Sequence, residues 1–207
     1  ISSLTTTQAA ALSGDQVAAL TTAQVSKLSA AQLGKIGTNQ IASLTTDQAA
    51  ILNSTQVAGL STAQVAAMEA ADIGKLSTSA IVGLSTAQMA AMTGDQIAAL
   101  STDQFAKLTA DQIGAIGTNQ IGALTTAQAS KLTATQVAGL STAQIARLEG
   151  DDLAQLSSAA IAGLSTTQIG ALTNQQIADL ATTQSAALTG AQLASLSTGV
   201  GRWKASG

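Results

Sequence analysis

The chain has 207 residues and a formal net charge of −3, with eight Lys and Arg against eleven Asp and Glu. It has no basic stripe that could neutralise a run of phosphates, so we expect no nucleic-acid partner. One Phe and one Trp are its only aromatic residues, which excludes a wide core built on rings. No apolar run approaches the roughly 18 residues that a membrane span needs, so we expect no insertion into a membrane.

An eight-residue repeat runs from Leu4 to Leu196 without a change of register. Position one of each octad is Leu, Ile or Met, position two is mostly Ser or Thr, and position five is usually Gln. Position six is usually Ile or Val, and position seven is nearly always Ala, Gly or Ser. In the second octad these positions are Leu12, Ser13, Gln16, Val17 and Ala18. We interpret residues 1–198 as one octapeptide-repeat solenoid.

The spacing within each octad predicts one very short capped helix. Ser13 and Gln16 have the spacing of a capping box. In this motif the Ser hydroxyl accepts from the backbone N–H of Gln, and the Gln side-chain oxygen accepts from the backbone N–H of Ser. Positions one and six then form a hydrophobic staple. The fold class predicted is therefore an all-α solenoid of helices of about 1.5 turns. A β-solenoid is the alternative, although the spacings of five and three between apolar positions would require a corner in every octad.

The charges support the helical interpretation. Ten of the eleven acidic residues occupy positions two to five, and the six basic residues within the array occupy position eight. A helix dipole favours anions at its N-terminus and cations at its C-terminus, whereas a sheet carries little net dipole. Only Asp179, at position eight, departs from this sorting.

Such short helices must be stabilised by their neighbours, because a single helix of this length is unstable in water. Small residues at position seven, such as Ala18 and Gly34, would let adjacent backbones approach closely. We expect two octads in each coil of the solenoid.

Ten octads form a higher unit of eighty residues. The sequence Ile-Gly-Thr-Asn-Gln-Ile occurs at residues 36–41 and again at 116–121. The octads that lack Gln are also eighty residues apart, and their residues at position five are Asp72, Ala80, Asp152 and Ala160. Tandem duplication explains the repeat, and a superhelical turn or a spaced binding face is the alternative. The carboxylates can still counter the helix dipole, so we predict that the octads with Ala are the weakest.

We assign no catalytic, cofactor-binding or metal-binding residue, and we expect the protein not to be an enzyme. Without His, Cys or Tyr, acid–base and nucleophilic chemistry would have to depend on carboxylates, Lys, Ser or Thr. The best local cluster is Glu149, Asp151 and Asp152, whose oxygens could hold Ca²⁺. Acids are also favoured on the first turn of a helix, and we prefer that interpretation.

Thr at position three offers a binding alternative. If these residues project to one flat face, their methyls and hydroxyls could bind ice or a glycan. Interruptions such as Gly14, Ala30 and Gly94 argue against a strict lattice. The recurring residues are Thr22, Thr46, Thr62, Thr86, Thr102, Thr126, Thr142 and Thr166.

The octads across residues 1–198 are similar to the Leu-Ser/Thr-x-x-Gln tracts of very large secreted or surface exoproteins of Gram-negative bacteria. The resemblance implies a non-enzymatic stalk, adhesin segment or self-assembling filament, located outside the cell or on its surface. Because the exposed ends of a repeat array can stack end to end, we also expect self-association through repeat ends or lateral faces, with a glycan or surface ligand as a further candidate partner.

A local stretch, Leu132-Thr-Ala-Thr-Gln-Val-Ala-Gly-Leu140, resembles the first helix of a TAL effector DNA-binding repeat. That resemblance implies nucleic-acid binding as a remote alternative, but the base-reading loop and the second helix of that family have no counterpart here. Capping chemistry alone accounts for the match.

The repeat pattern fails after Leu196, because Val200 stands where Gln belongs and Trp203 has no counterpart upstream. We interpret residues 199–207 as an off-pattern C-terminal tail or cap.

Overall fold

A computed structural model describes residues 1–201, with side-chain surroundings up to residue 196. The chain consists of two compact units, Ile1–Leu108 and Thr109–Gly207. The described residues form α-helices and no strand, with one helix in each octad from the first onward. The all-α solenoid is therefore confirmed, and the β-solenoid alternative is wrong. The off-pattern tail, with Trp203, lies largely outside the described residues.

The helices are four to six residues long, except for the last one, Gly190–Gly201, which has 12 residues. The first unit contains α1 Thr6–Ala10, α2 Gly14–Ala18, α3 Thr22–Val25, α4 Ala30–Leu33, α5 Thr38–Ile41, α6 Thr46–Ala50, α7 Ser54–Ala58, α8 Thr62–Ala67, α9 Ala70–Lys75, α10 Thr78–Val82, α11 Thr86–Ala91, α12 Gly94–Ala98 and α13 Thr102–Lys107. The second unit contains α14 Ala110–Ala115, α15 Thr118–Ile121, α16 Thr126–Ala129, α17 Ala134–Ala138, α18 Thr142–Ile145, α19 Gly150–Gln155, α20 Ser158–Ala162, α21 Thr166–Ile169, α22 Asn174–Asp179, α23 Thr182–Ala186 and α24 Gly190–Gly201.

The capping boxes predicted from the sequence begin most of these helices. At α8, Ser61 has extended backbone angles of φ −71° and ψ 161°, and its hydroxyl accepts from Gln64 N at 3.2 Å. Ser61 N donates to Gln64 Oε1 at 2.7 Å. Two of the orphan amides at the helix start are therefore satisfied within the octad. Asn53 caps α7 in the same way, whereas Gly37 and Gly117 provide no side-chain cap.

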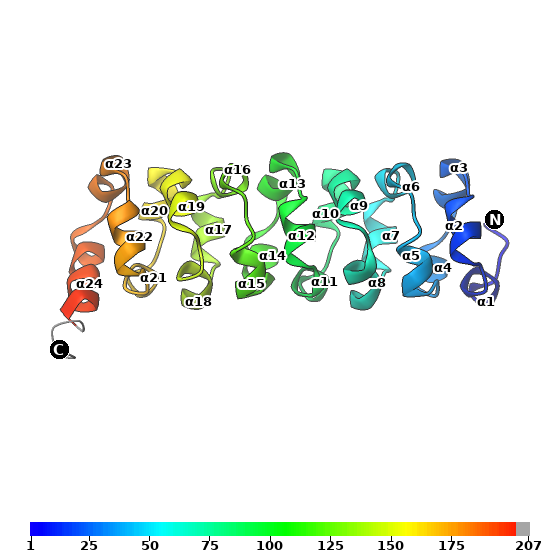
Figure 1. The fold of residues 1–207 in the computed structure, drawn as a ribbon, viewed down its shortest axis with the longest axis horizontal. Helices are drawn as coiled ribbons and strands as arrows, with labels where there is room; N and C mark the ends of the chain where they lie inside the picture. Colours follow the sequence, from blue (N-terminus) through cyan, green and yellow to red (C-terminus); the bar gives the residue numbers. More distant parts are fainter. Residues whose placement is uncertain (202–207) are drawn as a thin grey trace. The chain divides into compact units, whose positions relative to one another are not determined.

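Each coil contains three octads rather than the two that we expected. In the first unit, α1 packs on α4, α2 on α5 and α3 on α6, and this step of three continues to the pair α10 and α13. In the second unit the same step joins α14 to α17 and continues to the pair α21 and α24. Figure 1 shows the three helices of a coil following one another before the chain begins the next coil. A coil therefore comprises 24 residues, because each octad contributes one helix.

The core within each unit is formed by positions one and six of the octads. Ile97 is 0% exposed and Leu100 is 3% exposed, and the same alternation of a fully buried and a nearly buried residue continues along the chain. Phe105, which lies on α13 at position six of its octad, is the largest fully buried side chain among the described residues. Three helices enclose this core, which is why aliphatic residues fill it without a layer of aromatic rings.

Small residues allow close contact between successive coils. A Cβ added to Gly34, at position seven, would lie 2.6 Å from Gly59 O in the next coil, so the predicted role of this position is confirmed. Position eight is also in close contact, because a Cβ on Gly83 would lie 2.8 Å from Ser54 Cβ in the preceding coil. Backbones at these points therefore approach to a distance that larger side chains would prevent.

Candidate functional site

The Gln side chains at position five have a second role besides capping. The Nε2 atom of Gln64 donates to Leu33 O at 2.8 Å and to Ile36 O at 2.6 Å, both in the preceding coil. Gln64 is only 2% exposed. One amide therefore caps its own helix through oxygen and joins two coils through nitrogen. We call the two Nε2 bonds to the preceding coil the Gln stitch.

The stitch keeps a fixed register in both units. The Nε2 donor bonds the carbonyls found 28 and 31 residues earlier, as in the bonds of Gln88 with Val57 O at 2.9 Å and Leu60 O at 2.7 Å. In the second unit, Gln176 donates to Ile145 O and Leu148 O, both at 2.8 Å. Because these bonds lie in buried surroundings, an amide that failed to make them would leave unsatisfied polar atoms on both coils. Sequence reasoning assigned Gln to capping alone and missed this contact.

The first coil has the same amides in an exposed setting. Gln8, Gln16 and Gln24 are exposed, and each accepts through Oε1 from its own N-cap residue at 2.8 Å. Among the described residues, the structure gives their Nε2 atoms no acceptor. This face, defined by Gln8, Gln16 and Gln24 on α1, α2 and α3, is called the donor face below.

Asp72 and Asp152 replace Gln at two sites, and each is buried with one orphaned oxygen. Asp72 is 1% exposed and Asp152 is 2% exposed, and the Oδ2 atom of each has no hydrogen-bond partner. Burial, together with the smaller effect of the nearby Glu69 charge, raises the pKa of the Asp72 carboxyl from 3.8 to about 6. The pKa of Asp152 is likewise raised to about 6, mainly by burial and then by the charges of Glu149 and Asp151. The predicted benefit from the helix dipole is thus outweighed by burial.

Ala80 and Ala160 retain only half of the capping interaction. Ser77 Oγ accepts from Ala80 N at 3.1 Å, and Ser157 Oγ accepts from Ala160 N at the same distance. Neither Ala has a side-chain amide that could donate to the preceding coil. That these octads are the weakest remains a prediction.

The three acids considered as a Ca²⁺ site differ in solvent exposure. Asp152 is buried, whereas Glu149 at the N-cap of α19 and Asp151 in its first turn are exposed. Within the part of the chain that the structure describes, no three His, Cys, Asp or Glu side chains are grouped so that they could hold a metal ion. The three carboxylates therefore do not converge on one point.

The contact of Asp179 with the adjacent coil explains why it departs from the charge sorting. It ends α22, and its Oδ2 occupies the space that a Cβ on Gly150 would fill. Gly150 is the first residue of α19, which packs against α22. The carboxylate therefore lies beside the N-terminus of a helix in the adjacent coil, where the dipole favours an anion.

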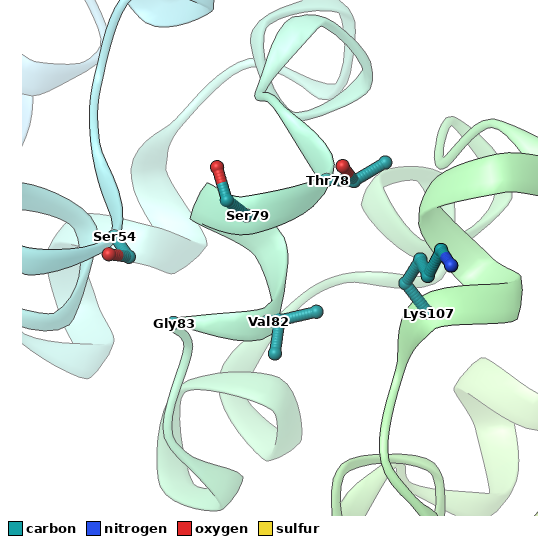
Figure 2. Close-up of a pocket in the computed structure, with 6 residues that line it drawn as sticks. All are labelled: Ser54, Thr78, Ser79, Val82, Gly83 and Lys107. Carbon is teal, nitrogen blue, oxygen red and sulfur yellow. The ribbon is translucent and has the colours of Figure 1, made fainter.

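One open groove of about 420 Å³ lies in the first unit, lined by Ser54, Thr78, Ser79, Val82, Gly83 and Lys107. Figure 2 shows Val82 of α10 and Lys107 of α13 on its two sides. Val82 is 41% exposed, and the lining contains hydroxyls and one ammonium group but no carboxylate. Lys107 is therefore the one ionisable side chain among the six residues that line the groove.

The Thr residues at position three do not form one continuous face. Because a coil has three octads, position three is distributed over three sides of each unit. On one side of the first unit Thr38, Thr62 and Thr86 succeed one another on α5, α8 and α11, and all three are exposed. On another side Thr46 is followed by Ala70 and Gly94, so the row is interrupted.

None of the described helices combines the length and hydropathy required to cross a bilayer. The family model of the ALTTAQ repeat matches residues 65–102, 113–150 and 145–182, which together exceed half of the chain. Its six-residue motif occurs verbatim at residues 19–24 and 123–128, where it spans the last position of one octad and the first five of the next. No curated protein matches the chain. The chain is thus a tandem-repeat protein that belongs to the ALTTAQ repeat family.

Proposed function

We propose that the chain is a non-enzymatic structural repeat segment that serves as a stalk, adhesin segment or self-assembling filament of an extracellular or cell-surface bacterial protein. The Gln stitch is the observation that supports this proposal most. Each coil presents amide donors on one side and backbone acceptors on the other, so one coil can add to the next by the same bonds. Sparse charge and the similarity to exoprotein tracts support the setting outside the cell.

For the 207-residue chain, we propose that copies associate through the donor face. Its three exposed amides have the arrangement that the stitch uses inside the units, and the matching acceptors are the carbonyls of another coil. Contact between the donor face of one copy and a coil of another copy is heterologous. Such contacts produce open filaments when they do not close into a ring.

Assembly of the 207-residue chain tests this function. In sedimentation velocity, the average mass should rise with protein concentration, and negative-stain microscopy should show particles that lengthen. The triple variant Gln8→Glu, Gln16→Glu and Gln24→Glu should remain monomeric. Glu keeps the capping oxygen, but it replaces each donor with a carboxylate that would oppose the carbonyls of an incoming coil.

A charge-matched control separates the donor face from a general effect of added charge. The variant Asn39→Asp, Asn119→Asp and Gln155→Glu adds the same charge at exposed positions away from the donor face. It should associate like the parent protein. A parent chain that stays monomeric at every concentration, or a control variant that loses assembly equally, would contradict the proposal.

A further inference from the structure

Any three successive helices make one full coil, and two such sets lack most of their stitches. In the coil of α8, α9 and α10, Gln64 makes the stitch, but the next two octads have Asp72 and Ala80 at position five. In the coil of α18, α19 and α20, Gln144 donates to Ile116 O at 2.5 Å and is followed by Asp152 and Ala160. Each of these two interfaces with the preceding coil is called a seam below.

The register of the stitch indicates what each Asp faces across its seam. Residues 28 and 31 positions before Asp72 are Leu44 and Ile41, and the residues at the same separation from Asp152 are Leu124 and Ile121. In other octads these carbonyls receive the Gln amide. An ionised carboxylate has only acceptor oxygens, so it cannot bond them, and Oδ2 of both Asp residues has no partner.

We propose that Asp72 and Asp152 are acid-operated stitches, because a proton taken from water onto Oδ2 supplies an O–H donor for a carbonyl of the preceding coil. The covalent Oδ2–H bond forms as an O–H bond of a hydronium ion breaks and releases water, and the new O–H then donates to the backbone oxygen. Protonation therefore tightens both seams, whereas ionisation leaves a buried charge opposite backbone oxygens. The seams are weak points at neutral pH and firm contacts in acid.

The surrounding charges favour the protonated form at both sites. Asp72 lies on α9, which packs on α6 and α12, and the charged groups of these three helices and the α9 N-cap are Asp47, Glu69, Lys75 and Asp95. Asp152 lies on α19, which packs on α16 and α22, and the corresponding groups are Lys131, just beyond α16, with Glu149, Asp151 and Asp179. Acids predominate around each site, so the ionised forms of Asp72 and Asp152 are disfavoured.

The direction of the pH dependence follows from the raised pKa. Both carboxyls have a pKa of about 6 in the folded chain, against 3.8 for the free group. A group with a raised pKa binds more protons in the folded state than in the unfolded state, so the free energy of unfolding decreases as the pH rises between these values. The seams should therefore be tightest below about pH 4 and fully loosened above about pH 7.

Urea unfolding of the full chain between pH 4 and pH 8 tests the proposal. The double variant Asp72→Gln and Asp152→Gln supplies a permanent amide with the length of the other stitches. Its urea midpoint should be higher than that of the parent at pH 7.5, and it should fall less than the parent midpoint between pH 4 and pH 7.5. Because ionisation is removed, the variant retains only the pH dependence of the exposed acids.

The matched control is Asp15→Gln and Asp103→Gln, which removes two exposed acids from first turns of helices that do not pack on α9 or α19. It should keep the fall in midpoint that the parent shows between pH 4 and pH 7.5. The pair Asp72→Asn and Asp152→Asn guards against poor folding of the Gln variant, because it is neutral and retains the length of Asp. If both neutral pairs keep the parent's full pH dependence, or if carboxyl NMR shows that both Asp residues titrate near pH 4, the proposal is overturned.

Discussion

The Gln88→Glu variant should lower the free energy of unfolding at pH 8 by about 3 kcal/mol, because a buried carboxylate would replace an amide donor. Gln88 is 3% exposed, and its Nε2 donates to Val57 O and Leu60 O. Glu retains the oxygen that caps Ser85 and nearly the same volume. The substitution therefore removes the stitch while the capping box stays intact. Urea denaturation followed by circular dichroism measures the change.

Gln24→Glu is the control for this experiment. Gln24 lies in a similar Thr-Ala-Gln sequence and makes the same capping box with Thr21, but it is exposed and belongs to the donor face. We expect a change below about 0.5 kcal/mol, as for surface substitutions generally. Equal losses for the two variants would mean that the bonds from Gln88 to the preceding coil do not stabilise the fold.

Phe105→Ala should be the most destabilising single truncation, with a loss of about 3–5 kcal/mol from the cavity it leaves. Phe105 is fully buried at position six of α13, which packs on α10. The thin core offers few neighbouring side chains that could move into the space. The expected result is a lower urea midpoint and increased hydrogen exchange of the α10 and α13 amides.

Ile51→Ala provides the comparison for Phe105→Ala. Ile51 is 37% exposed at position eight, so more than a third of its surface is already in contact with water. Its truncation should reduce the unfolding free energy by less than about 1 kcal/mol. Phe105→Ala with an equally small effect would show that position six is not the centre of the core.

The local features of the fold could be predicted from the sequence because they are complete within one octad. Ser61 and Gln64 are three residues apart, so their reciprocal capping bonds follow from spacing alone. The apolar residues at positions one and six likewise identify the core without knowledge of the coil. Both expectations needed only the properties of a helix start.

The number of octads per coil could not be predicted in the same way. An eight-residue period is identical whether two or three octads complete a coil, since nothing within an octad specifies its partner. The Nε2 atom of Gln64 bonds carbonyls 28 and 31 residues earlier in the chain. Capping within the octad already explains why Gln recurs at position five, so the sequence gives no separate sign of these bonds. The environment of Asp72 depends on that same contact, so its raised pKa was also beyond local reasoning.

An engineered disulfide tests most directly that three octads form a coil. The chain has no Cys, and a Cβ on Gly139 would lie 3.2 Å from Ala110 Cβ, close to the separation of about 3.5–4.5 Å in disulfides. Ala110→Cys with Gly139→Cys joins octads that are three apart, and Ala110→Cys with Lys131→Cys joins octads that are two apart. Under mild oxidation, the first pair should form an intramolecular disulfide and the second should remain reduced. Efficient closure of the second pair, with none of the first, would contradict the three-octad coil.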